Sequence, residues 1–293
     1  MELKGKRVTV IGLGNSGVNA ALLLSKHGAR VFATDSGVYS AELKKAKERL
    51  AAKNINVEIG AHSEAFVKGS DLVVVSPGVE ESSQSLKWAR EHKINMISEM
   101  ELGSRFCKGR IIAVTGTNGK STVTTLIGEI LKAGGNDTVV CGNIGNSLCG
   151  EIAGIKKDTW VVLEVSSAQL ERVEKFKPHI AIILNVTDDH MDRYKDFYEY
   201  LNYKLKIFAN QDERDLLILN YDAGNLRRLK GLARSNVIFY AKDRHASNGL
   251  DIAAYLKDEW ICCIHGEGEK EIVHVNDIRL KGVHNLENVI VSS

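Results

Sequence analysis

The sequence predicts an α/β protein: a small Rossmann-like, doubly wound N-terminal domain followed by a P-loop-type parallel-sheet domain. Short apolar runs recur along the chain, and glycine or polar residues follow them, as in parallel strands that are covered on both faces. Helical patterns separate several of these runs. The length of 293 residues exceeds the usual size of a single domain. We therefore expect domains at residues 1–102 and 103–293, with the boundary near 99–108.

Composition excludes several classes of protein. The net charge of +2 gives no reason to expect nucleic acid or an anionic membrane as a partner. No apolar run approaches the ~20 residues of a membrane-spanning helix, and the N-terminus shows no signal-peptide pattern. The five cysteines form no CxxC pair, and their odd number disfavours a disulfide framework. We expect a cytoplasmic protein.

The N-terminal part carries a dinucleotide-type fingerprint. A strand at 7–11 leads into Gly12-Leu13-Gly14-Asn15-Ser16-Gly17, a helical pattern follows, and Asp35 ends the next strand at 31–34. Such glycines let the backbone approach a diphosphate at a helix N-terminus, and an acid about 20 residues further on contacts a ribose. The motif alone favours NAD(P) or FAD over another nucleotide, and a UDP-linked ligand would satisfy the same donors.

A further strand at 71–75 ends in Ser76-Pro77-Gly78-Val79. Ligand contacts of open α/β sheets gather at the carboxyl ends of strands. An ordinary turn explains Ser76 and Gly78 equally well, so both interpretations stay open. A helix near 83–92 and a short strand at 95–98 complete the domain.

The most informative motif is Val-Thr-Gly-Thr-Asn-Gly-Lys-Ser-Thr at 114–122, directly after an apolar run. A buried strand, a glycine turn and a helix at 122–132 place backbone N–H groups around nucleotide phosphates. Lys120 would meet the β- and γ-phosphates, and the hydroxyl of Ser121 or Thr122 would bind Mg²⁺. Val114 stands where the usual P-loop has a glycine. The candidate nucleotide-binding residues here are Gly116, Thr117, Asn118, Gly119, Lys120, Ser121 and Thr122.

Polar residues also follow the next expected strands, at 138–140, 160–163 and 180–184. These residues are Asn143, Glu164 and the run Asp188-Asp189-His190. The strands' carboxyl ends should bring them beside the phosphate loop. Glu164 supplies the oxygen ligand that Mg²⁺ prefers, whereas a histidine suggests a second metal position at His190.

The last third of the chain offers fewer signals. A helix is expected at 196–208, where Lys204 and Lys206 lie on different faces, and a helical lysine is by default a solvated surface charge. Short runs at 253–256, 260–265 and 271–275 predict a small antiparallel sheet added to the parallel one.

Together these motifs resemble those of the Mur ligases, the ATP-dependent amide-bond-forming enzymes of peptidoglycan synthesis, over essentially the whole chain. The family's phosphate loop has the form Gly-Thr-Asn-Gly-Lys-Ser/Thr, which explains why Val114 stands where the usual P-loop has a glycine. The stretches Leu-Glu-Val-Ser-Ser-Ala-Gln-Leu at 163–170 and Asn-Val-Thr-Asp-Asp-His-Met-Asp-Arg-Tyr at 185–194 are more specific. With the fingerprint and Ser76-Pro77-Gly78, they resemble the member that adds D-glutamate to UDP-N-acetylmuramoyl-L-alanine.

The resemblance implies roles that composition and spacing do not. The first domain would bind a UDP-sugar and not NAD, and the substrate contacts would be Asn15, Ser16, Asp35, Ser36, Ser76, Gly78, Asn143, Ser166 and Gln169. Lys204 would be carbamylated to N6-carboxylysine and bind a second Mg²⁺ with His190, whereas Ser121 and Glu164 would bind the first. Asn285 and Asn288 would contact the adenine of ATP.

The implied reaction forms an acyl phosphate from the substrate carboxylate and ATP, and the D-glutamate amine then displaces phosphate. The catalytic set would be Lys120, Asn143, Glu164, His190 and Lys204. Family members continue into a third domain. We therefore expect this chain to correspond to the first two domains of a monomeric enzyme, to bind the UDP-substrate and not to turn over alone.

Three alternatives stay open at this stage. A sister ligase of the Mur type or the folylpolyglutamate type would share the phosphate loop. An NAD(P)-dependent oxidoreductase would explain the fingerprint but leave Lys120, Glu164 and His190 without roles. A non-catalytic nucleotide-binding regulator would need neither the third domain nor turnover.

Overall fold

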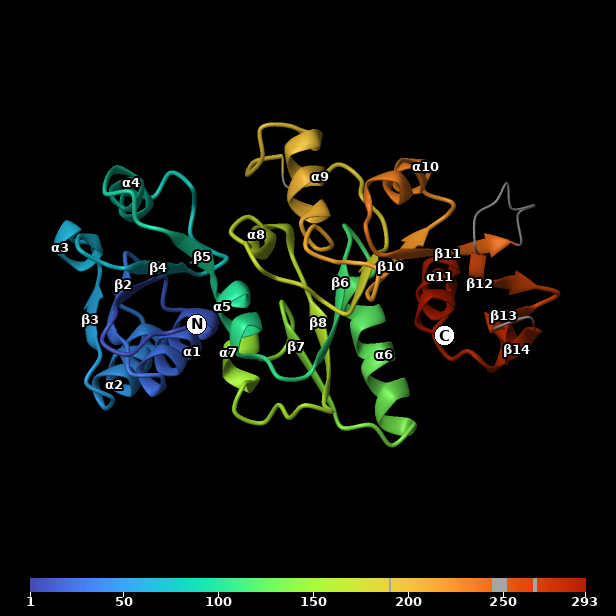
Figure 1. Cartoon of the computed structure of the whole chain (residues 1–293), viewed down its shortest axis with the longest axis horizontal. Coiled ribbons are helices and arrows are strands. Elements are labelled where there is room, and N and C mark those ends of the chain that lie inside the picture. The colour runs from blue at the N-terminus through green and yellow to red at the C-terminus, as the bar shows by residue number, and fades with distance from the viewer. Residues whose placement is uncertain (190, 244–251, 266–267) are drawn as a thin grey trace. The chain divides into compact units, whose positions relative to one another are not determined.

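The computed structural model describes residues 1–189, 191–243, 252–265 and 268–293 (Figure 1). The chain forms two compact units. Unit 1 comprises Met1–Cys107, Cys141–Ile155 and Ala168–Phe176, and unit 2 comprises Lys108–Val140, Lys156–Ser167 and Lys177–Ser293. The division of the chain into domains at residues 102 and 103 stays a proposal. Across the described ranges, no helix has the length and apolar character needed to cross a membrane.

Unit 1 is built on a parallel sheet with the strand order β3-β2-β1-β4-β5. The central strand β1 pairs with β2 on one side and with β4 on the other, so that Val10 of β1 lies between Ala33 of β2 and Val74 of β4. The chain moves from β1 toward β2 on one side and reaches β4 on the other, which makes the gap between β1 and β4 a topological switch point. The strands are β1 (Arg7–Ile11), β2 (Arg30–Asp35), β3 (Asn56–Ile59), β4 (Leu72–Val75) and β5 (Met96–Ser98).

Helices cover both faces of this sheet, as in a doubly wound fold (Figure 1). Successive residues of β4 point to opposite faces: Leu72 and Val74 join one apolar cluster, and Val73 and Val75 join another. The first cluster packs against α1 (Asn15–Lys26), α2 (Ala41–Ala51) and α5 (Glu99–Phe106), and the second against α3 (Glu64–Val67) and α4 (Gln84–Glu91).

Unit 2 contains a larger sheet with the order β14-β13-β12-β11-β10-β9-β6-β8-β7. Strands β8, β6, β9, β10, β11 and β12 pair in parallel, whereas β13 and β14 are antiparallel. The expected antiparallel addition is therefore confirmed. The strands are β6 (Arg110–Thr115), β7 (Thr138–Gly142), β8 (Trp160–Glu164), β9 (Ile180–Ile183), β10 (Leu216–Asn220), β11 (Asn236–Asp243), β12 (Ile252–Lys257), β13 (Trp260–His265) and β14 (Gly268–His274).

The helices of unit 2 place the phosphate loop and its surroundings. Helices α6 (Lys120–Ala133) and α11 (Val283–Ser292) pack together and share an apolar core with the sheet. Helices α9 (Phe197–Leu205) and α10 (Gly224–Arg227) lie on the other side of this sheet from α6 and α11 (Figure 1). Asp196 caps α9 by accepting the N–H of Glu199 at 2.8 Å, which fixes where this helix begins. The predicted α/β class, with a parallel sheet in unit 1 and a mostly parallel sheet in unit 2, is confirmed.

A buried carboxylate fastens a late segment of unit 1 to α5. The side chain of Glu101 is fully buried, and it accepts the N–H groups of Glu174 at 3.1 Å, Lys175 at 3.0 Å and Phe176 at 2.9 Å. Nε of Arg105 donates a further hydrogen bond at 2.7 Å. Four donors compensate the cost of burying this charge. Glu101 thereby holds the segment 168–176.

We predict that Glu101→Ala lowers the free energy of unfolding by about 3–5 kcal/mol, because Arg105, the buried N–H of Phe176 and two partly buried N–H groups lose their acceptor. Urea denaturation measures the change. Arg90→Ala is the matched control, since its ion pair with Glu81 is exposed and should contribute less than about 1 kcal/mol. Equal effects of the two substitutions would contradict this account of Glu101.

Candidate functional site

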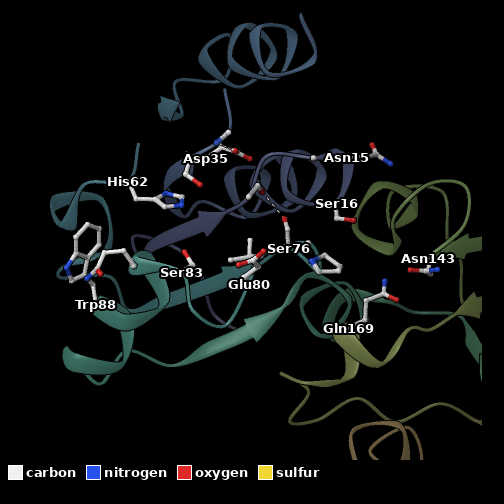
Figure 2. A pocket seen from close by; sticks show the side chains of 18 of the residues that line it. Asn15, Ser16, Asp35, His62, Ser76, Glu80, Ser83, Trp88, Asn143 and Gln169 are labelled. Carbon is white, nitrogen blue, oxygen red and sulfur yellow. Dashed lines mark hydrogen bonds between the residues drawn. The ribbon is translucent and has the colours of Figure 1, made fainter. Parts of the chain in front are cut away.

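Unit 1 contains a cavity of about 940 Å³ at the carboxyl ends of its strands (Figure 2). The loops after β1, β2 and β4 form much of its wall, as the switch-point rule predicts. The cavity brings together Asn15, Ser16, Asp35, Ser36, Ser76, Gly78, Asn143 and Gln169. Ser166 does not line it; this residue follows β8 in unit 2 and is half-buried. All other predicted substrate residues thus share one cavity.

Asp35 joins two of the loops that shape the cavity. Its Oδ2 accepts the N–H of Leu13 at 2.6 Å, and its Oδ1 accepts the N–H of Gly37 at 2.7 Å. Both carboxylate oxygens therefore have backbone donors. Asp35 is a structural anchor of the cavity wall as well as a candidate ligand contact.

The glycine fingerprint lets the first turn of α1 pack closely against the backbone of the loop after β1. A Cβ on Gly17 would lie 1.8 Å from the carbonyl oxygen of Gly12, which no side chain tolerates. The Ser76 hydroxyl donates to the same Gly12 carbonyl at 2.8 Å, and this bond ties the loop after β4 to the loop after β1. The first turn of α1 consequently opens into the cavity, where a helix N-terminus favours an anion such as a diphosphate.

Amide side chains hold Asn15 at this helix start. Nδ2 of Asn15 donates to Oδ1 of Asn146 at 3.1 Å, and the buried Asn19 donates to the same oxygen at 2.8 Å. Asn146 in turn donates to Oε1 of Glu151 at 2.8 Å. Asn15 is therefore part of a fixed polar network that includes the segment 141–155 of unit 1.

Sequence reasoning missed the end of the cavity that His62, Glu80 and Trp88 line. Figure 2 shows His62 and Trp88 opposite the end that holds Asn143 and Gln169. The His62 ring shares a hydrogen bond of 2.8 Å with the Thr34 hydroxyl. Burial lowers the pKa of His62, although Asp35 and Glu58 counteract the shift, so the ring favours its neutral form. The alternation of Val57 and Ile59 with polar residues in β3, the strand before His62, was the available signal.

In unit 2 the predicted phosphate loop joins β6 to α6. Gly119 adopts φ +86°, a left-handed conformation that favours glycine, and α6 begins at the next residue. Lys120 donates through Nζ to the carbonyls of Gly116 at 3.0 Å and Thr117 at 2.8 Å. Ser121 and Thr122 lie in the first turn of α6, whose N–H groups have no partner within the helix.

Lys204 meets the same loop. Its side chain is 1% exposed, and Nζ donates to the Gly116 carbonyl at 2.9 Å. The default expectation of a solvated lysine is therefore wrong at this position. Burial, together with repulsion from Lys120, lowers the pKa of Lys204 to about 7, although Asp189 acts against the shift. Above about this pH the side chain is mainly a neutral, nucleophilic amine.

Carboxylates offset this concentration of positive charge. Burial lowers the pKa of Lys120, whereas the charges of Glu164 and Asp189 raise it. Glu164 ends β8 and is 1% exposed. A buried carboxylate beside a phosphate loop suits Mg²⁺, which binds proteins through one or two carboxylates together with phosphate oxygens. No group of three or more His, Cys, Asp or Glu side chains suited to a metal occurs among the residues that the structure describes.

Helix α11 carries two further predicted residues, of which Asn288 lies against the phosphate loop. Oδ1 of Asn288 would lie 2.6 Å from a Cβ built on Gly119, so this amide rests against the loop. Nδ2 of Asn288 donates to Oδ1 of Asn285 at 3.4 Å. His190 lies outside the described residues. Asn143 belongs to unit 1 and Glu164 to unit 2, and their expected convergence stays a prediction.

The fold and the two sites define an α/β protein with a cavity at the carboxyl ends of one parallel sheet and a separate glycine-rich loop of the phosphate-loop type. Residues 6–98 match the MurD-like N-terminal domain of Mur ligases, and residues 114–293 match the Mur ligase middle domain. The chain belongs to the Mur ligase family.

Curated relatives agree with this assignment, and solved structures share the fold. The chain is 41% identical to the UDP-N-acetylmuramoylalanine–D-glutamate ligases of Koribacter versatilis and Thermoanaerobacter sp., over 100% of its own length and 63% of theirs. A crystal structure of UDP-N-acetylmuramate:L-alanyl-gamma-D-glutamyl-meso-diaminopimelate ligase from Neisseria meningitides has a TM-score of 0.62 at 16% identity, covering 98% of this chain and 92% of that one. UDP-N-acetylmuramate-alanine ligase from Thermotoga maritima has a TM-score of 0.52 at 19% identity, covering 98% and 64%. These likenesses show the fold.

We predict that Gly17→Ala destabilises unit 1 by about 3 kcal/mol, because the added methyl group overlaps the Gly12 carbonyl. Gly14→Ala in the same loop is the control, since a Cβ there meets nothing within 4 Å and its change should stay below about 1 kcal/mol. Urea denaturation of both variants is the measurement. A stable Gly17→Ala protein would contradict the close approach of the two turns.

Proposed function

We propose that the whole protein to which this chain belongs is an ATP-dependent ligase that adds D-glutamate to UDP-N-acetylmuramoyl-L-alanine in peptidoglycan synthesis. The observation that carries the proposal is the shared cavity of unit 1, which all the predicted UDP-substrate residues except Ser166 line. The 41% identity to ligases with this name supports it. The chain spans 63% of the length of these relatives.

The proposed chemistry has two steps. A carboxylate oxygen of the UDP-substrate attacks the γ-phosphorus of ATP, ADP leaves, and an acyl phosphate forms. The amine of D-glutamate then attacks the acyl carbon, phosphate leaves, and the nitrogen loses a proton as the amide forms. Lys120 is suited to neutralise charge on the transferred phosphoryl group, where catalysis of this kind mainly acts. Asn285 and Asn288 are proposed to contact the adenine.

Mg²⁺ would be held by Glu164 and Ser121 at one site and by His190 and a carbamylated Lys204 at a second. When bound, it would neutralise phosphate charge and polarise the phosphoryl oxygen. The buried amine of Lys204 fits carbamylation, because its lone pair is available to CO₂ near neutral pH and the product is an anionic oxygen ligand. Asn143 is proposed to contact the reacting substrate. We also propose a cytoplasmic monomer that binds neither membrane nor nucleic acid.

Titration calorimetry tests the proposed ligand. We predict that residues 1–293 bind UDP and UDP-N-acetylmuramoyl-L-alanine but not NAD⁺. Asp35→Ala should weaken UDP binding at least about tenfold, because the loops after β1 and β2 lose their common acceptor. Lys206→Ala, in unit 2, should leave it unchanged. Binding of NAD⁺ in place of UDP would overturn the proposal in favour of an oxidoreductase.

Carbon NMR with ¹³C-labelled CO₂ tests Lys204. At a constant concentration of dissolved CO₂, we predict that a carbamate signal grows as the pH rises from about 6 to about 8, because the lowered pKa of about 7 releases the neutral amine in this range. Each carbamate that forms releases one proton as the N–C bond is made. Lys204→Ala should abolish the signal and Lys206→Ala should retain it. The reverse pattern would contradict the assignment.

A further inference from the structure

The loops that follow β6 and β9 remain hydrogen-bonded beyond the ends of the two strands. Within the sheet, the N–H of Leu184 donates to the Thr115 carbonyl at 3.0 Å. Past the strands, the N–H of Thr117 donates to the Asn185 carbonyl at 3.0 Å. The Thr117 hydroxyl then accepts the N–H of Thr187 at 3.1 Å. The phosphate loop and the loop toward Asp189 therefore form one paired structure.

The carboxamide of Asn185 makes the most contacts in this pairing. Its Oδ1 accepts the N–H groups of Thr117 at 3.0 Å and Asn118 at 2.8 Å. Its Nδ2 donates to the carbonyl of Asn118 at 3.1 Å. One half-buried side chain thus satisfies both backbone groups of Asn118, a residue that is otherwise exposed to solvent. The pairing of β6 with β9 ends at Thr115. Beyond it, the side chain of Asn185 makes hydrogen bonds to Asn118 of the kind that a neighbouring strand would make.

These contacts divide the loop into two parts. The N–H groups of Thr117 and Asn118 both have an acceptor within the protein, Oδ1 of Asn185. The first-turn N–H groups of α6, which begins at Lys120, have no acceptor within the helix. A phosphate would therefore bind at the start of α6, while Asn185 fixes the preceding residues.

We propose that Asn185 is a positioning residue for the nucleotide: it holds the phosphate loop in the shape that presents the start of α6 to the phosphates. The inference rests on the proposed function only in taking a nucleotide as the ligand. A carboxamide is required because the loop offers both N–H donors and a carbonyl acceptor. An aspartate would keep the acceptor atoms, lose the donor to the Asn118 carbonyl, and add a negative charge close to the phosphates.

Amide exchange tests the positioning role without any nucleotide. Asn185→Ala should accelerate hydrogen exchange of the Asn118 N–H by about tenfold, the effect of losing one net hydrogen bond. The Thr117 N–H should change less, because it retains the Asn185 carbonyl. Asn225→Ala is the matched control: Asn225 donates to the Val186 carbonyl at 3.0 Å in the same region but does not touch the phosphate loop. Unchanged exchange at Asn118 would overturn the proposal.

Calorimetry with MgATP gives the second measurement. Asn185→Ala should weaken MgATP binding by about tenfold, and Asn185→Asp should weaken it further, with the excess reduced at high salt. Both variants should bind UDP as tightly as the wild type, which verifies that unit 1 folds, and retained exchange protection of strands β6 and β9 verifies that unit 2 folds. Wild-type MgATP affinity in Asn185→Ala would overturn the proposal. A wild-type chain that binds no MgATP would instead count against the proposed ligase function, and the exchange experiment would still decide the role of Asn185.

Discussion

The candidate nucleotide site in unit 2 depends on one backbone carbonyl, that of Gly116, which two lysine side chains share. Lys120 and Lys204 both donate to it, at 3.0 and 2.9 Å. A neutral oxygen cannot balance the buried Lys204 and the half-buried Lys120, so burial and mutual repulsion favour loss of a proton, and the pKa of Lys204 falls to about 7. Glu164 and Asp189 supply the nearby negative charge. The site is therefore arranged around cations that an anionic ligand would stabilise.

The same sheet geometry produces both candidate sites. In each unit, parallel strands end at a common edge, and the connection that follows the first strand is rich in glycine. In unit 1 the backbone carbonyl of Gly12 is held by Ser76, and in unit 2 that of Asn118 is held by Asn185. In both cases a side chain from a neighbouring strand end continues the hydrogen bonding where the sheet has stopped. This leaves the helix N-terminus open toward a phosphate.

Much of the fold could be predicted because strands buried on both faces are almost continuously apolar, as in β4 and β6. The edge strand β3, Asn-Val-Glu-Ile, has no such run, and it was missed together with His62 behind it. Strands β10 and β11 do carry apolar runs, and the same criterion would have found them. The burial of Lys204 could not be predicted from its helix, because it depends on a loop 88 positions earlier in the chain.

Asn185 illustrates the same limit at the level of one residue. The sequence pattern places it after a buried strand, but its contacts depend on the pairing of β9 with β6, which ends at Thr115 and Ile183 and leaves Asn118 and Asn185 in the loops beyond. Because the Thr117 hydroxyl also accepts from Thr187, a movement of the phosphate loop must disturb the segment that leads to Asp189. Asp189 in turn acts on the charges of both Lys120 and Lys204. The phosphate loop, its two lysines and Asp189 therefore belong to one hydrogen-bonded and electrostatic cluster.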